Sequence, residues 1–239
     1  ISKTFAVKGA IQSTLFTHTK FPFLLVKDAI VDTFRDKLGE RPNVNIKTPQ
    51  VVFDLYIKES QVTISLNTSG APLYQRGYRT EVGEAPLNEV TAAALIRLSK
   101  WDRKSTFMDP FCGSGTLLIE AALLASGIPS NIDRQHYAFK NFIGFDSAMW
   151  EKIQSEAIKT CKGFDFEILG SDMDSDMMMM AKRNLRGLPI GRFVNVTSNA
   201  FQDVKKPSDH GTIVCNPPYG ERMGDGIEEM YQELGEKKK

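Results

Sequence analysis

Residues 109–116 read Asp109-Pro110-Phe111-Cys112-Gly113-Ser114-Gly115-Thr116. A short β-prone run precedes them at 106–108, and an apolar, helix-prone run follows at 117–124. Glycines let a ligand approach the backbone, and the free N–H groups of a helix N-terminus face that ligand. A strand, a glycine-rich turn and a helix in this order therefore predict the start of an α/β nucleotide-type site.

The composition is that of an ordinary globular protein. The chain has 239 residues, 41% of them hydrophobic and 25% charged, and it has three cysteines without a CxxC pair. No apolar run approaches the roughly 20 residues that span a bilayer, so we expect a cytoplasmic protein with reduced thiols, no membrane segment and no metal site. The net charge of +1 is uneven, with +5 on residues 1–80 and −4 on the rest. A basic front part is compatible with an anionic partner, although chance asymmetry on a solvated surface explains the charge equally well.

Residues 1–66 are expected to form a small α+β unit. A strand is expected near residues 4–7, a helix over 23–38 that stops at Gly39, and an antiparallel hairpin from 51–57 and 62–66. The chain begins without Met, so we expect upstream sequence that completes this unit. Residues 67–85 are expected to be a linker.

The rest of the chain, 86–239, alternates strands with helices. Strands are expected at 106–109, 166–169, 193–197 and 212–215. Helices are expected at 88–98 after Pro86, at 116–125, at 147–161 with Ser147 as N-cap, from Asp174 or Ser175 to 185, and from 227 to 234. This alternation predicts an α/β fold with a Rossmann-like, doubly wound parallel sheet. Only four strands are recognisable, so we expect that a polypeptide ending at Lys239 is not a complete enzyme.

Four stretches rich in glycine, acidic or amide residues fall at the carboxyl ends of these strands, where doubly wound sheets bind ligands. They are 109–116, 172–174, 199–200 and 216–220. Leu118 stands where a dinucleotide fingerprint would have its third glycine, and the Walker pattern is absent. Asp109 would repel a pyrophosphate and suits a ligand with a cationic amino-acid end. S-adenosylmethionine fits, with Asp172 accepting from the ribose hydroxyls and Asn199 near the adenine.

Residues 216–219 read Asn216-Pro217-Pro218-Tyr219. An exocyclic amine on a base is a weak nucleophile because its lone pair is delocalised into the ring. The side-chain carbonyl of Asn216 and the backbone carbonyl of Pro217 can accept its hydrogens and orient the lone pair, and Tyr219 can stack on a flipped base. The alternative is a plain proline turn after a strand.

These stretches resemble the bacterial 23S rRNA guanine-N2 methyltransferases that carry an N-terminal THUMP domain. The resemblance is carried by residues 5–7, 26–32, 39–42, 76–79, 85–87, 109–122, 170–172 and 216–222. It implies a THUMP-type RNA-binding domain over 1–66, with its front part missing, and a class I methyltransferase domain over 86–239, with its C-terminal part missing.

The resemblance and the motif positions together give a set of candidate site residues. The cofactor-binding candidates are Asp109, Phe111, Gly113, Gly115, Thr116, Asp172, Met173, Asn199 and Ala200, and the catalytic candidates are Asn216, Pro217 and Tyr219. The RNA-binding candidates are Arg41, Lys47, Arg76, Tyr78 and Arg79, the last three because arginines interleaved with tyrosine can pair with phosphate and stack on bases. For 76–79 the alternative is an ordinary interdomain linker.

Three functions therefore stay open. The leading hypothesis is S-adenosylmethionine-dependent methylation of guanine N2 in 23S rRNA. The same loop also suits adenine N6 or a protein amide, which would make the protein a DNA or protein methyltransferase. A non-catalytic RNA-binding assembly factor is the third. The sequence leaves open the nucleotide that is modified, the state of the rRNA substrate and the oligomeric state.

Overall fold

A computed structural model describes residues 2–16, 18–79, 86–132, 134–205, 208–218 and 227–236. The chain divides into two compact units, one made of Ile1–Leu73 with Gln135–Trp150, the other of Tyr74–Arg134 with Glu151–Lys239. No helix within the described ranges is long and apolar enough to cross a membrane.

The first unit is a three-stranded sheet with one helix. Its elements are β1 (Phe5–Gln12), α1 (Phe21–Leu38), β2 (Val51–Lys58) and β3 (Gln61–Leu66). The sheet order is β1-β2-β3, with β1 parallel to β2 and β2 antiparallel to β3. The helix and the hairpin expected from the sequence are thus confirmed, whereas β1 is longer than expected.

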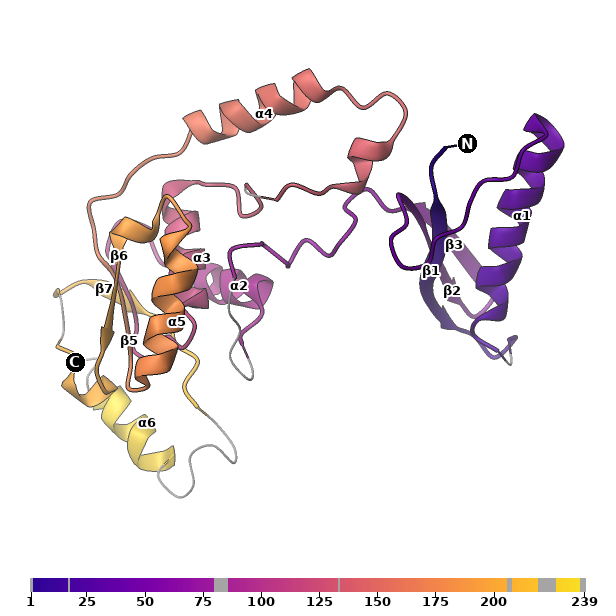
Figure 1. The fold of residues 1–239 in the computed structure, drawn as a ribbon. Helices are drawn as coiled ribbons and strands as arrows, with labels where there is room; N and C mark the ends of the chain where they lie inside the picture. The colour runs from indigo at the N-terminus through magenta and orange to yellow at the C-terminus, as the bar shows by residue number, and fades with distance from the viewer. Residues whose placement is uncertain are drawn as a thin grey trace. The chain divides into compact units, whose positions relative to one another are not determined.

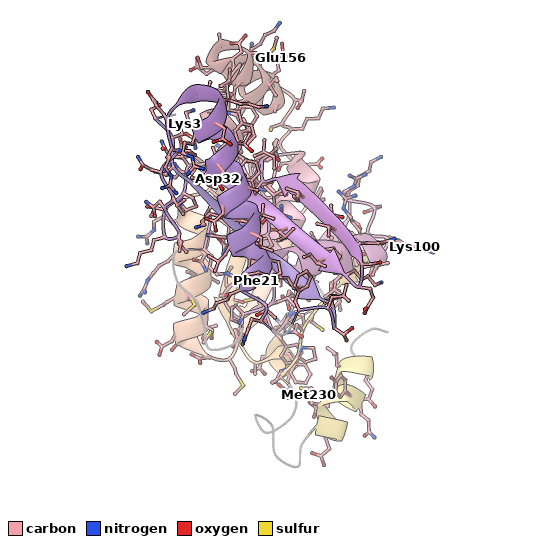
Figure 2. All side chains as sticks on the ribbon, turned by 90° about the vertical axis from the view of Figure 1, so that its right-hand side faces the viewer. Lys3, Phe21, Asp32, Lys100, Glu156 and Met230 are labelled. Carbon is pink, nitrogen blue, oxygen red and sulfur yellow. The ribbon has the colours of Figure 1, made fainter. Side chains whose placement is uncertain are left out.

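Helix α1 packs along this sheet, as the two views show, and Phe21 and Asp32 mark its course in Figure 2 (Figures 1 and 2). Val31 on the helix is buried, as are Leu55 and Ile57 on β2. The helix ends at Gly39, which has φ +72° and donates its N–H to the carbonyl of Arg35 at 2.9 Å. Glycine suits this position because a left-handed cap is strained for other residues.

Residues 135–150 lie far along the chain but belong to the first unit. The short helix η1 (Ala138–Asn141) contacts β2. The backbone N–H of Phe139 donates to the carbonyl of Thr68 at 2.9 Å, and the Asn141 side chain donates to the carbonyl of Gln50 at 3.1 Å. The sequence pattern did not predict this excursion, because it placed the whole stretch after residue 86 in the second domain.

The second unit is the α/β sheet that the alternating pattern predicts. Its elements are α2 (Glu89–Leu98), β4 (Thr106–Asp109), α3 (Thr116–Ser126), β5 (Ile168–Asp172), α5 (Ser175–Arg186), β6 (Val194–Ser198), β7 (Gly211–Ile213) and α6 (Ile227–Glu236), with two short helices, η2 (Gly191–Phe193) and η3 (Phe201–Asp203). Helix α4 (Ser147–Lys159) begins in the first unit and ends in the second. All four strands are parallel, in the order β6-β5-β4-β7.

This strand order creates a switch point beside β4. From β4 the chain winds to β5 and then β6 on one side, and β7 pairs on the other side. The carboxyl ends of β4 and β7 are therefore neighbours, and the N–H of Val214 donates to the carbonyl of Met108 at 3.1 Å. Ligands of doubly wound sheets bind at such a switch point.

The core of the second unit forms between the sheet and α3. Phe107 on β4, Ile168 on β5, and Leu118 and Ile119 on α3 are fully buried. The close approach needs Gly170 on β5, because a Cβ there would come within 2.3 Å of a Leu118 methyl carbon. The hydrophobic segments at both ends of the glycine turn are thus the structural centre of this unit.

Helix α2 starts within one residue of the expectation, and Asn88 caps it, since its side chain accepts from the N–H groups of Val90 and Thr91. The start of α4 differs from the expectation. The Ser147 N-cap is wrong, because the Asp146 carboxylate accepts the N–H of Met149 at 2.9 Å. Aspartate is at least as good an N-cap as serine, so sequence preference did not separate the two neighbours.

Candidate functional site

A cleft of about 890 Å³ opens at the carboxyl ends of the four parallel strands. The loops after β4, β5, β6 and β7 all contribute to its lining, and so do Pro86 and Leu87 before α2 and three residues of α6. Figure 1 shows α6 close to this end of the sheet, and Figure 2 marks Met230 on it. The site is therefore built from segments that the sheet brings together from more than a hundred residues of sequence.

The glycine turn forms the floor of the cleft. Gly113 and Gly115 both adopt left-handed φ angles, +49° and +84°. A Cβ on Gly115 would also press against Ala181 of α5 at 3.2 Å. The Ser114 carbonyl accepts from the Asn184 side chain at 3.1 Å, which fixes the turn to α5. The turn thus presents the first N–H groups of α3 to the cleft.

Asp109 is a buried carboxyl at the end of β4. Its side chain is 1% exposed and accepts the N–H of Phe111 at 3.1 Å. Burial raises the pKa of Asp109 to about 7; the Phe111 hydrogen bond lowers it, and the charge of Asp172 raises it. Because burial disfavours the charged form, a cationic partner in the cleft would stabilise the carboxylate.

Asp172 ends β5 on the other side of the turn. One of its carboxylate oxygens accepts the N–H of Gly113 at 2.9 Å and the other accepts the N–H of Asp174 at 3.0 Å. Each oxygen keeps a lone pair for a further donor. Asp172 is thus held in place while it can still accept from a ligand.

Aromatic and apolar side chains line the part of the cleft after β5 and β6, which we call the slot. Met173, Ala200 and Phe201 line it, and the Phe201 ring centroid lies 5.1 Å from the Phe111 ring centroid at an interplanar angle of 38°. Such a slot suits a flat, apolar-faced group like an adenine ring.

The loop after β7 forms the other wall. Asn216, Pro217 and Pro218 line the cleft, and Asn216 is exposed. Tyr219, the third catalytic candidate, lies outside the described residues. The side-chain amide of Asn216 is therefore available to a ligand in the cleft.

Charge distinguishes this cleft from a phosphate site. Among the described residues that line it there is no Lys, Arg or His. The lining instead includes five carboxylic acids: Asp109, Asp172, Asp174, Glu229 and Glu233.

Most candidates from the sequence meet in the cleft. The cofactor candidates that line it are Asp109, Phe111, Gly113, Thr116, Asp172, Met173 and Ala200. Two others are not among its lining residues. Gly115 sets the conformation of the turn, and Asn199 is exposed and donates to the Thr197 hydroxyl at 3.2 Å.

The structure places the Arg76, Tyr78 and Arg79 side chains inside the second unit, not on an RNA-facing surface. Tyr78 is 8% exposed, and the two arginine side chains are 14% and 13% exposed. They contact Glu120 and Glu89 of their own unit. The phosphate-binding interpretation therefore does not fit these three residues, because carboxylates of the same unit balance the two arginine charges and accept the Tyr78 hydroxyl hydrogen.

Arg41 and Lys47 are exposed on the first unit. Both lie in the segment between α1 and β2, whose turn is braced by Asn45 accepting from the backbone of Lys47 and Thr48. For these two, contact with RNA stays a prediction.

Several lining residues were not predicted from the sequence. Phe201 directly follows the candidate stretch 199–200, so a stretch longer by one residue would have included it. Glu229, Met230 and Glu233 come from α6, and no strand-end signal marks them. Their spacing along one helical face was the only available signal.

Comparisons with known proteins agree with this arrangement. Residues 76–239 match the family UPF0020, described as RMKL-like, methyltransferase domain, and residues 1–67 match the THUMP domain. The chain is 40% identical over 245 residues to the ribosomal RNA large subunit methyltransferase K/L of Shewanella frigidimarina, and 38% over 244 residues to that of Shewanella baltica. Each alignment covers 98% of this chain and 34% of the relative, so the chain spans about a third of the length of these curated relatives.

Solved structures show the same fold. SMU.472, described as a putative methyltransferase complexed with SAH, superposes with a TM-score of 0.85 at 29% identity over 99% of this chain and 64% of that chain. A protein from Listeria monocytogenes described as a predicted N6-adenine-specific DNA methylase gives 0.84 at 30% identity, over 98% and 62%. The cleft therefore lies on the sheet of a methyltransferase fold.

Proposed function

Because the chain belongs to the RMKL-like methyltransferase family and carries a THUMP domain, we propose that it methylates the exocyclic N2 of a guanine in 23S rRNA. We propose S-adenosylmethionine as the methyl donor. The names of the curated relatives support a large-subunit rRNA substrate. The choice of guanine N2 rests on the resemblance of the sequence motifs.

The acidic lining of the cleft carries the cofactor assignment. Five carboxylic acids and no basic side chain among its described lining residues favour a cationic ligand over a nucleotide with several phosphates. S-adenosylmethionine, when bound, supplies a methyl group on a positively charged sulfur and also carries an ammonium. Asp109 would hold the ammonium, Asp172 would accept from the ribose hydroxyls, and the slot with Phe111 and Phe201 would take the adenine.

Asn216 and Pro217 would prepare the target amine. Their carbonyl oxygens can accept both amine hydrogens, which directs the nitrogen lone pair into the cleft. Direct transfer needs the nitrogen about 3 Å from the methyl group and in line with its bond to sulfur. The residues of the β7 loop would therefore act by positioning and hydrogen bonding, without a covalent enzyme intermediate.

The same acidic cleft repels an RNA backbone, so phosphate contacts have to come from elsewhere. The first unit is the candidate, because its residues, 1–73 and 135–150, carry 10 Lys/Arg and 7 Asp/Glu, a net charge of +3, and Arg41 and Lys47 are exposed there. A nucleotide flipped out of its helix can bring an uncharged base into the cleft while its phosphates stay outside.

Methylation of adenine N6 is the second candidate. It is favoured by the similarity to the Listeria protein, whose description names adenine N6 as its target. The Asn216 loop can hold either amine, so the product decides between them.

The experiment is a methyl-transfer assay with labelled S-adenosylmethionine and unmodified 23S rRNA, followed by mass spectrometry of the nucleosides. We expect N2-methylguanosine. Asn216→Ala should lower turnover by about 10²–10³, as for other preorganised polar groups at a reacting centre, with cofactor affinity little changed. Asn216→Asp, which keeps an acceptor, should be less harmful. Full activity of Asn216→Ala would contradict the mechanism, and N6-methyladenosine would contradict the substrate.

A further inference from the structure

The segment that contains residues 76–79 lies along one face of α3. The Tyr78 hydroxyl donates to a carboxylate oxygen of Glu120 at 3.0 Å, and Nε of Arg76 lies 3.5 Å from the same oxygen. Thr116 and Glu120 are four residues apart on the helix and therefore share a face. The segment thus follows this face from its middle to its first turn, where the helix meets the cleft.

Arg79 connects two residues that line the cleft, Leu87 and Thr116. Its Nη2 donates one N–H to the Leu87 carbonyl at 2.8 Å and one to the Thr116 hydroxyl oxygen at 3.0 Å. The Glu89 carboxylate lies 3.7 Å from the same nitrogen and balances its charge. Leu87 and Thr116 line the cleft, whereas Arg79 is not among the lining residues. Arg79 therefore acts on the site through its neighbours.

The direction of the hydrogen bond to Thr116 decides what its hydroxyl can do. A hydroxyl has one hydrogen to donate, and Arg79 has no lone pair to accept it. Since the oxygen accepts from a cation, its own hydrogen is left for another acceptor and is made a stronger donor by polarisation. Thr116 is also the first residue of α3, so the N–H groups of the helix N-terminus lie beside this hydroxyl.

The amino-acid end of the proposed cofactor offers an ammonium and a carboxylate. Asp109 has already been placed against the ammonium. A carboxylate beside it needs donors, and the first turn of α3 provides them. The Thr116 hydroxyl is the side-chain donor among them.

We propose that Arg79 is a positioning residue that holds the Thr116 hydroxyl as a donor for the carboxylate of the cofactor's amino-acid end. The inference rests on the proposed cofactor. It assigns to the Arg-Gly-Tyr-Arg segment a role in recognising one end of the ligand, in place of the RNA contact expected from its sequence.

Two ligands separate this role from a structural one. S-adenosylhomocysteine has the amino-acid end, whereas 5′-methylthioadenosine has the same adenosine and sulfur without it. We expect Arg79→Met to weaken S-adenosylhomocysteine at least about tenfold, because a hydrogen bond to a charged group is removed, and to leave 5′-methylthioadenosine within about twofold. Isothermal titration calorimetry measures both affinities.

Companion variants keep the test decisive if Arg79→Met does not fold. Thr116→Val should reproduce the selective weakening of S-adenosylhomocysteine. Thr116→Ser keeps the hydroxyl and should bind this ligand like wild type. The double variant Arg79→Met/Thr116→Val should bind S-adenosylhomocysteine no more weakly than the weaker of the two single variants. Arg79→Lys should have an intermediate affinity for S-adenosylhomocysteine, because the lysine ammonium has enough donors but its side chain is shorter. Arg97→Met, an exposed arginine on α2, is the matched control and should bind both ligands like wild type.

The outcomes are distinct. An equal weakening for both ligands, or none for either, overturns the inference while the cofactor assignment stands. Wild-type protein that binds neither ligand overturns the cofactor assignment and this inference with it.

Discussion

Asp109→Asn should make the ligand-free protein more stable and the cofactor complex weaker. The pKa of Asp109 rises from 3.8 to about 7 in the folded protein, a shift of about 3 units, and each unit corresponds to about 1.4 kcal/mol. The folded-state pKa is raised, so this contribution to stability is fully present below about pH 4 and is lost as the pH rises through 7. At pH 8 the buried charge therefore costs up to about 4 kcal/mol of the free energy of unfolding.

Asparagine removes that charge and keeps the oxygen that accepts the Phe111 N–H. Its buried NH₂ group has a desolvation cost of about 1–3 kcal/mol, so we expect a net gain of about 1–3 kcal/mol at pH 8. The gain should shrink and then reverse towards pH 4, where wild-type Asp109 is itself uncharged and the cost of the buried NH₂ group remains. Urea denaturation without ligand at several pH values between 4 and 8 measures this difference.

Binding should change in the opposite sense. Loss of a charge-assisted hydrogen bond of about 1.5–3 kcal/mol should weaken S-adenosylmethionine by about 10- to 150-fold in calorimetry. Wild-type affinity should rise with pH through about 7, as Asp109 ionises, and the variant should lack this rise.

Asp102→Asn is the control, because its effect on the free energy of unfolding should change with pH in the opposite direction. Hydrogen bonds from the Lys104 and Ser105 backbone lower the pKa of this exposed carboxyl, so its contribution is present above its unfolded pKa and is lost as the pH falls. A variant Asp109→Asn whose stability difference from wild type does not grow with pH, or that binds the cofactor like wild type, would refute the reasoning.

Three further outcomes are expected. Gly115→Ala should lower the free energy of unfolding by about 1–2 kcal/mol for the left-handed backbone alone, and by more because the new Cβ would lie 3.2 Å from Ala181. Gly127→Ala is the control, because Gly127 has φ +71° and open space around it and should show the backbone cost only. Equal costs of the two variants in thermal denaturation would count against the close packing at Gly115. Asp172→Asn should weaken S-adenosylhomocysteine and 5′-methylthioadenosine alike, because both carry the ribose, and a weakening confined to one of them would remove Asp172 from the ribose site. Neutralising Arg41 and Lys47 should lower the slope of log affinity for rRNA against log salt by about one unit for each phosphate that the variant no longer neutralises, and an unchanged slope would exclude a role of these two residues in RNA binding.

The sequence predicted those parts of the molecule that depend on neighbours in the chain. The strand, glycine turn and helix at 106–126, the alternation that builds the parallel sheet, and a cap at Asp174 or Ser175 all follow from local patterns. The structure has these features, with Asp174 as the cap. The stretches at the strand ends met in one cleft because parallel strands deliver their carboxyl ends to the same edge.

Long-range pairing accounts for the misses. Arg79 looks like a phosphate ligand until Glu89 and Thr116 are brought to it, and the hydrogen bond to Thr116 spans 37 positions. Residues 135–150 carry no local sign that they join the first unit, since the hydrogen bond between Asn141 and Gln50 spans 91 positions. Such partners depend on the completed fold, and local propensity does not encode them.

The most direct test of the proposed function is mass spectrometry of nucleosides from 23S rRNA of a strain that lacks the gene. We predict that one N2-methylguanosine is lost in that strain, that it returns with the wild-type gene, and that it does not return with Asn216→Ala. An unchanged nucleoside profile, or restoration by Asn216→Ala, would contradict the assignment of this cleft as the site of guanine N2 methylation.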